Sequence, residues 1–145
     1  MSTAVTTHQR RDTFHVPKRK QSVPEARSQV RKILSDWGID GELASDVAAV
    51  STELVTNAVQ HCRVTYSRIE VTLSIRGDGL RVEVSDPDRG RIPALCVGDD
   101  QGEGGRGLVL VAGLAEHWGH ELRPFTKCVW ATFSVPEGAH VPADA

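Results

Sequence analysis

The segment STELVTNAVQH, residues 51–61, holds two polar side chains with the spacing of one helix face. Glu53 and Asn57 are four residues apart, so a helix places them side by side. A carboxylate beside a carboxamide suits phosphate chemistry, because magnesium takes hard oxygen ligands and a carboxylate can orient or deprotonate a hydroxyl or water. An ordinary polar helix face explains the same pair, so the rest of the chain has to decide between the two interpretations.

Apolar side chains at helical spacing predict two helices in the first half of the chain. The helix that contains Glu53 is expected to begin after a capping Asp40 and to run to about His61. The helix before it is expected to begin with a capping box formed by Ser22 and Glu25.

Farther along the chain the period changes from helical to alternating. Residues 69–76 and 80–85 alternate apolar and polar side chains on either side of Gly77-Asp78-Gly79, which predicts a β-hairpin with one buried face. Further strands are expected at 13–16, 120–123 and 128–135.

The pattern is lost from Asp86 to Arg106, in a segment rich in glycine and proline. Loops of this length in compact domains are often lids or binding loops. Gly102–Gly107 contains G-x-G-x-x-G, but no strand directly precedes it, so the dinucleotide-binding fold is rejected. Glycines still let backbone N–H groups approach phosphates, next to the positive end of a helix expected over 108–118. A flexible surface loop is the alternative.

Asp86 stands where the second predicted strand ends and this loop begins. A carboxylate at a strand end can accept a hydrogen bond from an adenine amino group. A turn-initiating aspartate before Pro87 explains the residue equally well.

The order of these elements predicts an α+β two-layer sandwich, in which helices cover one face of a mostly antiparallel mixed sheet. The 145 residues fit one domain. It is expected over 12–136, between flexible tails at 1–11 and 137–145.

Composition and charge exclude several classes of function. The formal net charge is −2 and no basic run continues past residue 20, so broad nucleic-acid binding is not expected. No apolar run has the length of a membrane span and the N-terminus lacks a signal peptide, so a cytoplasmic protein is expected. Cys62, Cys96 and Cys128 show no C-x-x-C spacing, which argues against a disulfide framework or a zinc knuckle.

Three signals follow one another along the chain: a helix with Glu53 and Asn57, a strand that ends in Asp86, and a glycine-rich segment before a helix. In this order they resemble the GHKL ATPase superfamily with its Bergerat ATP-binding fold, over roughly residues 12–135. Residues 51–61 look like the N-box of bacterial anti-sigma-factor serine kinases. Residues 106–111 look like their G2 box, and Val129-Trp130-Ala131 is similar to their final strand.

The resemblance implies ATP and Mg²⁺ as cofactors and a role for each matching residue. Asn57 matches the magnesium-binding asparagine, Glu53 the acidic residue proposed as general base, and Asp86 the adenine-recognising aspartate. The other nucleotide-binding positions that it implies are Gly90, Gly104, Gly105, Arg106, Gly107 and Leu108.

Two departures from the family pattern lie at the adenine end. The usual D-x-G-x-G of the G1 box is Asp86-Pro87-Asp88-Arg89-Gly90 here, so only Gly90 is kept. Cys128 replaces a threonine that would help to hold the water network beside adenine. The resemblance therefore implies an intact phosphate end and an altered adenine end.

Chain length favours the anti-sigma kinase group, because about 20 residues precede the first helix and leave no room for the dimerising helices of a sensor kinase. The expected function is transfer of the ATP γ-phosphate to a serine or threonine of a small antagonist protein. A sigma factor would be the second partner, and a homodimer is expected. The alternatives are a binding module that uses ATP only as a conformational ligand or not at all, and an ATP hydrolase.

Overall fold

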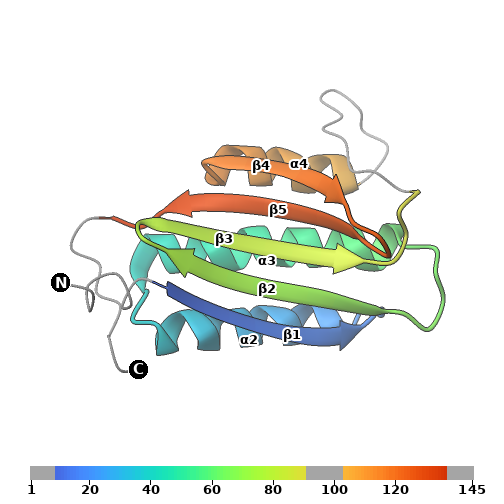
Figure 1. Cartoon of the computed structure of the whole chain (residues 1–145), viewed down its shortest axis with the longest axis horizontal. Coiled ribbons are helices and arrows are strands. Elements are labelled where there is room, and N and C mark those ends of the chain that lie inside the picture. Colours follow the sequence, from blue (N-terminus) through green and yellow to red (C-terminus); the bar gives the residue numbers. More distant parts are fainter. Residues whose placement is uncertain (1–8, 91–102, 137–145) are drawn as a thin grey trace.

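The computed structural model describes residues 9–90 and 103–136, with residues 103–107 described by their backbone alone. In this part of the chain a five-stranded sheet carries its helices on one face and leaves the other face uncovered (Figure 1). The strand order is β1-β2-β3-β5-β4. The elements are β1 (Gln9–Pro17), α2 (Ser22–Asp36), α3 (Gly41–His61), β2 (Arg68–Arg76), β3 (Gly79–Asp86), α4 (Glu103–Leu114), β4 (His117–Leu122) and β5 (Lys127–Ser134).

The predicted two-layer α+β architecture is confirmed, and its sheet is simpler than expected. All four pairs of neighbouring strands are antiparallel, so the described part of the sheet is not mixed. None of the helices described is both long and apolar enough to cross a membrane.

Helix α3 supplies much of the core between the two layers. Its residues Val47, Val50 and Leu54 are 0%, 0% and 2% exposed, and they pack in one cluster with inward-facing side chains of the sheet. Full burial of one such side chain stabilises the fold by about 1.5–3 kcal/mol. The helix predicted from Asp40 to His61 is confirmed, although the Asp40 side chain makes no capping hydrogen bond.

The predicted capping box of the preceding helix is wrong. The residue at the N-cap of α2 is Gln21, and no side chain caps the helix. The Ser22 hydroxyl instead donates a hydrogen bond of 2.6 Å to the Pro17 carbonyl oxygen, which ties the start of α2 to the end of β1. The side chain is thereby directed towards β1, and its oxygen accepts no capping hydrogen bond from the amides of its own helix.

The β2–β3 hairpin follows the predicted alternation. Arg76 pairs with Gly79, so the turn holds two residues, Gly77 and Asp78. Gly77 has a φ of +63°, as expected for the first central residue of a turn that fits the strand twist.

Strand β1 begins at Gln9 rather than at residue 13, and it pairs with β2 along its whole length. Residues 9–11, which the sequence places in a flexible tail, are therefore part of the sheet. Their polar side chains gave no apolar alternation, because an edge strand needs little burial to pair through its backbone.

The helix expected over 108–118 is displaced towards the N-terminus. Helix α4 already starts at Glu103 and ends at Leu114. Trp118 and Gly119 belong to β4, so Gly119 does not stop a helix. Strand pairing prevails here because Gly119 lies opposite Trp130, whose ring fills the space where a side chain would stand.

Candidate functional site

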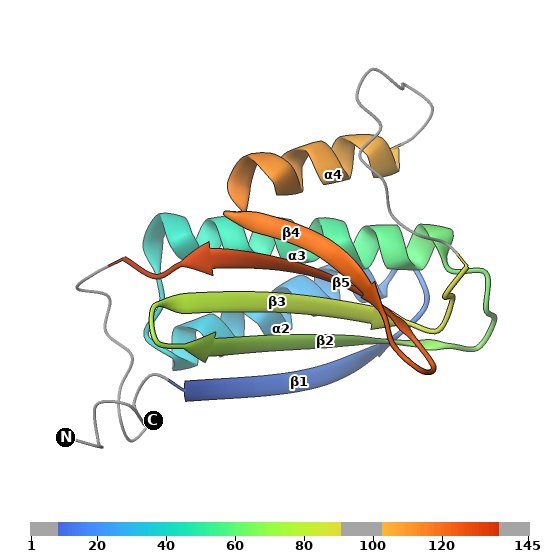
Figure 2. The ribbon, with the colours of Figure 1, turned by 45° about the horizontal axis from the view of Figure 1, so that its top comes forward.

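The segments that carry the predicted site residues meet at one end of the molecule. Figure 2 shows the C-terminal end of α3, the C-terminal end of β3, the start of β5 and the first turn of α4 on the same side. Helices α3 and α4 also pack against each other. The fold therefore brings together signals that lie far apart in the sequence.

Glu53 and Asn57 are half-buried on α3, and their side chains have no hydrogen bond or ion pair to residues 9–90 and 108–136, whose side chains are described. The hydroxyl groups beside them are already used. Those of Ser51, Thr52 and Thr56 each donate a bond of 2.7 Å to the carbonyl oxygen four residues earlier. Among the side chains of this segment, the carboxylate and the carboxamide thus keep their polar atoms available to a ligand.

Asp86 is 2% exposed at the end of β3 and has two polar contacts. Its Oδ1 accepts a 2.8 Å hydrogen bond from the Asp88 amide, and its Oδ2 lies 3.4 Å from Nζ of Lys127. A carboxylate oxygen has more than one acceptor position, so these contacts leave room for a further donor such as an amino group.

Lys127 was not predicted from the sequence, and its register with β3 also shows which face of the sheet holds Cys128. Asp86 pairs with Lys127 across the sheet, and Ser85 pairs with Cys128. Side chains alternate between faces along a strand. Lys127 therefore shares the face of Asp86, and Cys128 lies on the opposite face. Position 128, which the resemblance matches to a family threonine beside adenine, therefore does not share the face of Asp86 in this chain.

Cys128 lies on the face of the sheet that no helix covers, but neighbouring side chains bury it fully. Burial raises the pKa of Cys128, because a thiolate would lose its hydration there. The side chain is a packing element that stays neutral.

A second feature missed from the sequence is an ion pair that replaces part of the G1 box. Nε and Nη2 of Arg63 donate to the two carboxylate oxygens of Asp88 at 3.0 and 3.2 Å, and the Arg63 amide adds a bond of 2.8 Å. These hydrogen bonds hold the pKa of the Asp88 carboxyl far below its usual range. They also raise the pKa of Arg63. The pair joins the turn after β3 to the chain that leaves α3.

Gly90 lies next to this pair and donates its amide hydrogen to Oδ1 of Asp88 at 3.2 Å. A Cβ atom at this position would lie 2.9 Å from Nη2 of Arg63. A side chain at position 90 would therefore have to displace the end of the flexible Arg63 side chain.

The predicted phosphate-binding segment is only partly described. Gly104, Gly105 and Gly107 lie in the first turns of α4, where the sequence predicted the end of a loop. The Arg106 side chain and residues 91–102 lie outside the described residues. Leu108 is 3% exposed, so its side chain belongs to the interior and only its backbone could face a nucleotide.

The described residues contain no group of three or more His, Cys, Asp or Glu side chains that could hold a metal ion. A cation at this site would have to share its ligands between protein and phosphate oxygens, as Mg²⁺ does when phosphates are present.

Comparison with known proteins agrees with this arrangement. The family model described as a histidine kinase-like ATPase domain matches residues 16–133. Among solved structures, the chain matches the crystal structure of the RsbU and RsbW domains of Rv1364c from Mycobacterium tuberculosis, with a TM-score of 0.64 and 22% sequence identity. That match covers 86% of this chain and 33% of the other, so this chain spans about a third of it. The comparison with curated proteins gives no match.

At this identity the structural match establishes the fold alone. The family model covers all of the helices, and all of the strands except part of β1 and the last residue of β5. The resemblance to GHKL ATPases that the motifs predicted is thereby confirmed. The chain belongs to the histidine kinase-like ATPase domain family.

Proposed function

We propose that this chain is an ATP-binding anti-sigma factor that phosphorylates a serine or threonine of a small antagonist protein. The observation that carries the proposal is the Glu53–Asn57 pair. Both side chains lack a partner in the described residues, while the hydroxyls around them bond within α3. Polar side chains without a partner inside the protein, on a helix that packs in the core, can bind a ligand.

The residues present fit a nucleotide with its magnesium ion. Asp86 offers an acceptor for an adenine amino group, and the Asn57 carboxamide offers a hard oxygen for the metal. The N-terminal turn of α4 offers backbone N–H groups and a positive dipole end to phosphates. When bound, Mg-ATP supplies the phosphoryl group and the charge that neutralises its oxygens.

In this proposal the protein contributes mainly position and charge. Asn57 holds the metal in place, Asp86 fixes the adenine, and Glu53 orients the acceptor hydroxyl and takes its proton. Gly104, Gly105, Arg106 and Gly107 would surround the phosphates, which are the positions implied by the family resemblance. The partners would be the antagonist protein and a sigma factor, and the chain would act as a homodimer in the cytoplasm.

The test is phosphate transfer from labelled ATP to a cognate antagonist. Glu53→Gln should lower the transfer rate by about 10²–10⁴-fold, the usual contribution of a general base. ATP binding, measured by calorimetry, should persist. Glu42→Gln is the matched control, since Glu42 is exposed on the first turn of the same helix. Equal transfer rates for the two variants would remove Glu53 from the chemistry, and ATP binding without transfer to any antagonist would refute the kinase.

One observation favours a second candidate function, that of a non-catalytic domain that binds a partner protein. Asp86 already has Lys127 at 3.4 Å, and the altered G1 turn is held by Asp88 and Arg63. A domain of this kind could bind its partner without ATP. Calorimetric titration with Mg-ATP separates the two candidates. If Mg-ATP gives no heat and leaves Tm unchanged, the chain does not bind ATP, and only the protein-binding function remains.

A further inference from the structure

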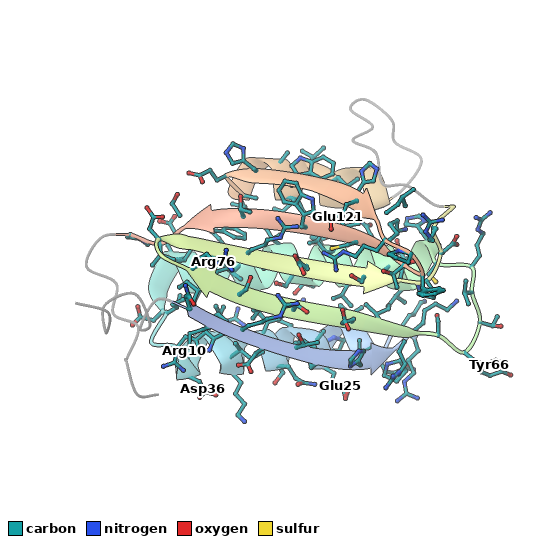
Figure 3. The ribbon with its side chains drawn as sticks, in the orientation of Figure 1. Arg10, Glu25, Asp36, Tyr66, Arg76 and Glu121 are labelled. Carbon is teal, nitrogen blue, oxygen red and sulfur yellow. The ribbon has the colours of Figure 1, made fainter. Side chains whose placement is uncertain are left out.

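The uncovered face of the sheet contains a hollow of about 590 Å³ that the proposed function does not use. We call it the arginine groove. Figure 3 looks onto this face and shows Arg76 near the end of the sheet that is remote from the nucleotide site. The lining residues used below are Arg11, Ser74, Arg76, Gly79, Arg81 and Thr132.

Strand register explains why a hollow forms here. Arg11, Ser74, Arg81 and Thr132 stand in one row across β1, β2, β3 and β5. In the next row Arg76 stands opposite Gly79, which has no side chain. Small residues therefore form the floor, and long arginine side chains rise around it. Since neighbouring strands lie about 4.8 Å apart, the four-strand row spans roughly 14 Å.

The charges around this floor are not balanced within the described part of the chain. Arg11 and Arg76 are exposed and make no ion pair or side-chain hydrogen bond there. The acidic residue in the lining, Glu83, is already engaged by Arg81 at 2.7 Å and by Arg123 at 3.5 Å. The groove is therefore basic in a chain whose formal net charge is −2.

Arg81 is held in place by its surroundings. Its guanidinium carbon lies 4.7 Å from the centre of the Trp130 ring, and Nη2 lies 3.6 Å from Oε1 of Glu121. Because Arg81 already pairs with Glu83 and Glu121, it shapes the wall of the groove, and the charge available to a ligand is that of Arg11 and Arg76. One wall of the groove is thus rigid, and the two exposed arginines form the adjustable part.

The groove is separate from the nucleotide site. Asp86 lies seven residues beyond Gly79 on β3, about 23 Å at 3.3 Å per residue. The row of Arg11, Ser74 and Arg81 also lies on the face that no helix covers. Asp86 continues the alternation of the core residues Leu80, Val82 and Val84, so it faces the helical layer. A ligand in the groove would not touch the residues proposed to hold ATP.

We propose that the arginine groove binds an acidic segment of a partner protein. Its volume falls in the range of about 300–1,000 Å³ that is typical of ligand sites, and a four-strand width suits a peptide with several carboxylates rather than a single small anion. Guanidinium groups pair with carboxylates through two parallel hydrogen bonds, and the Ser74 hydroxyl can donate to a backbone carbonyl of the segment. The proposal does not depend on nucleotide binding.

The test is fluorescence anisotropy of the whole chain with a fluorescein-labelled hexaglutamate peptide at low salt. Arg76→Gln should weaken binding about tenfold, and the double variant Arg11→Gln/Arg76→Gln should weaken it further. Arg68→Gln is the matched control: Arg68 lies on the same face of β2, eight residues away and roughly 26 Å from Arg76. The control should bind as tightly as the unaltered chain.

Three results would overturn the proposal. The first is that the peptide does not bind, even if inorganic phosphate does. The second is that Arg76→Gln leaves peptide binding unchanged. The third is that Arg68→Gln weakens binding as much as Arg76→Gln, which would mean diffuse attraction. Arg76→Gln should leave Tm unchanged because Arg76 is exposed and lacks described contacts, so loss of binding cannot be assigned to unfolding.

Discussion

Single residues at the proposed adenine end show how this chain departs from its family while keeping a defined structure. Asp88 stands where the G1 box usually has glycine, and Arg63 gives this carboxylate a bidentate partner. The two residues are 25 positions apart, so neither spacing nor periodicity could have predicted the pair. Lys127 was overlooked for a related reason, because only the register with β3 shows which of two adjacent residues faces Asp86.

The Asp88–Arg63 pair predicts a definite dependence of stability on pH. The folded-state pKa of Asp88 is depressed, so the pair contributes stability above the unfolded pKa of about 3.9. That contribution falls as the pH drops from there towards the folded pKa. Asp88→Asn should therefore lower Tm at pH 7, and the difference from the unaltered chain should shrink below about pH 4.

Asp36→Asn is the control for this measurement, because Asp36 is exposed at the end of α2 and forms no ion pair within the described residues. Thermal unfolding followed by circular dichroism at several pH values provides the comparison. A Tm difference for Asp88→Asn that stays constant from pH 7 to pH 3 would contradict the assigned role of its charge.

At the scale of elements, the long periodic signals were reliable, whereas the glycines at 102–107 and at 119 were misinterpreted. Helix α3 and the β2–β3 hairpin carry long apolar patterns, and the structure confirms both. Helix α4 begins within a glycine-rich segment because it packs on α3, and such tertiary contacts outweigh local propensity. Strand β1 extends through polar residues because pairing with β2 needs only its backbone.

Gly119 in β4 gives an element-scale prediction. A Cβ atom there would lie 2.8 Å from Cζ2 of Trp130, so Gly119→Ala should push the ring away and destabilise the β4–β5 pair by about 1–3 kcal/mol. Gly113→Ala in α4 is the matched substitution. Nothing lies within 4 Å of the position that its methyl group would take, and alanine in a helix should stabilise by about 0.5–1 kcal/mol.

Urea unfolding of the two variants measures both effects. Opposite signs are expected, with Gly119→Ala less stable and Gly113→Ala more stable than the unaltered chain. If Gly119→Ala proved neutral, the Trp130 ring would not be fixed over β4, and the reason for a strand where the sequence predicted a helix end would fail.

The two proposed sites lie on opposite faces of one sheet. The proposed nucleotide residues lie at one end and on the helical side, and the arginine groove lies at the other end of the uncovered face (Figures 2 and 3). The sequence identified the first set because three motifs stand in a diagnostic order. It could not reveal the groove, because residues of four strands form it and only their register brings Arg11, Arg76 and Arg81 together.

This separation allows nucleotide binding to be tested on the whole molecule without disturbing the groove. A ligand that binds only the folded chain at 100 times its Kd stabilises it by about 2.7 kcal/mol, which corresponds to a rise in Tm of several degrees for a domain of this size. Mg-ATP should produce such a rise. Asn57→Ala should remove most of the part that requires magnesium, because the carboxamide is the proposed metal ligand.

Gln60→Ala is the control for Asn57→Ala, since Gln60 is exposed on the same helix three residues farther on, and it should keep the full rise in Tm. Arg76→Gln should also keep it, because the groove and the nucleotide site share no residue. If Asn57→Ala kept the magnesium-dependent rise, the metal would bind elsewhere. If Arg76→Gln lost the rise, the two faces would be coupled through the sheet, and peptide binding would then have to be measured with and without nucleotide.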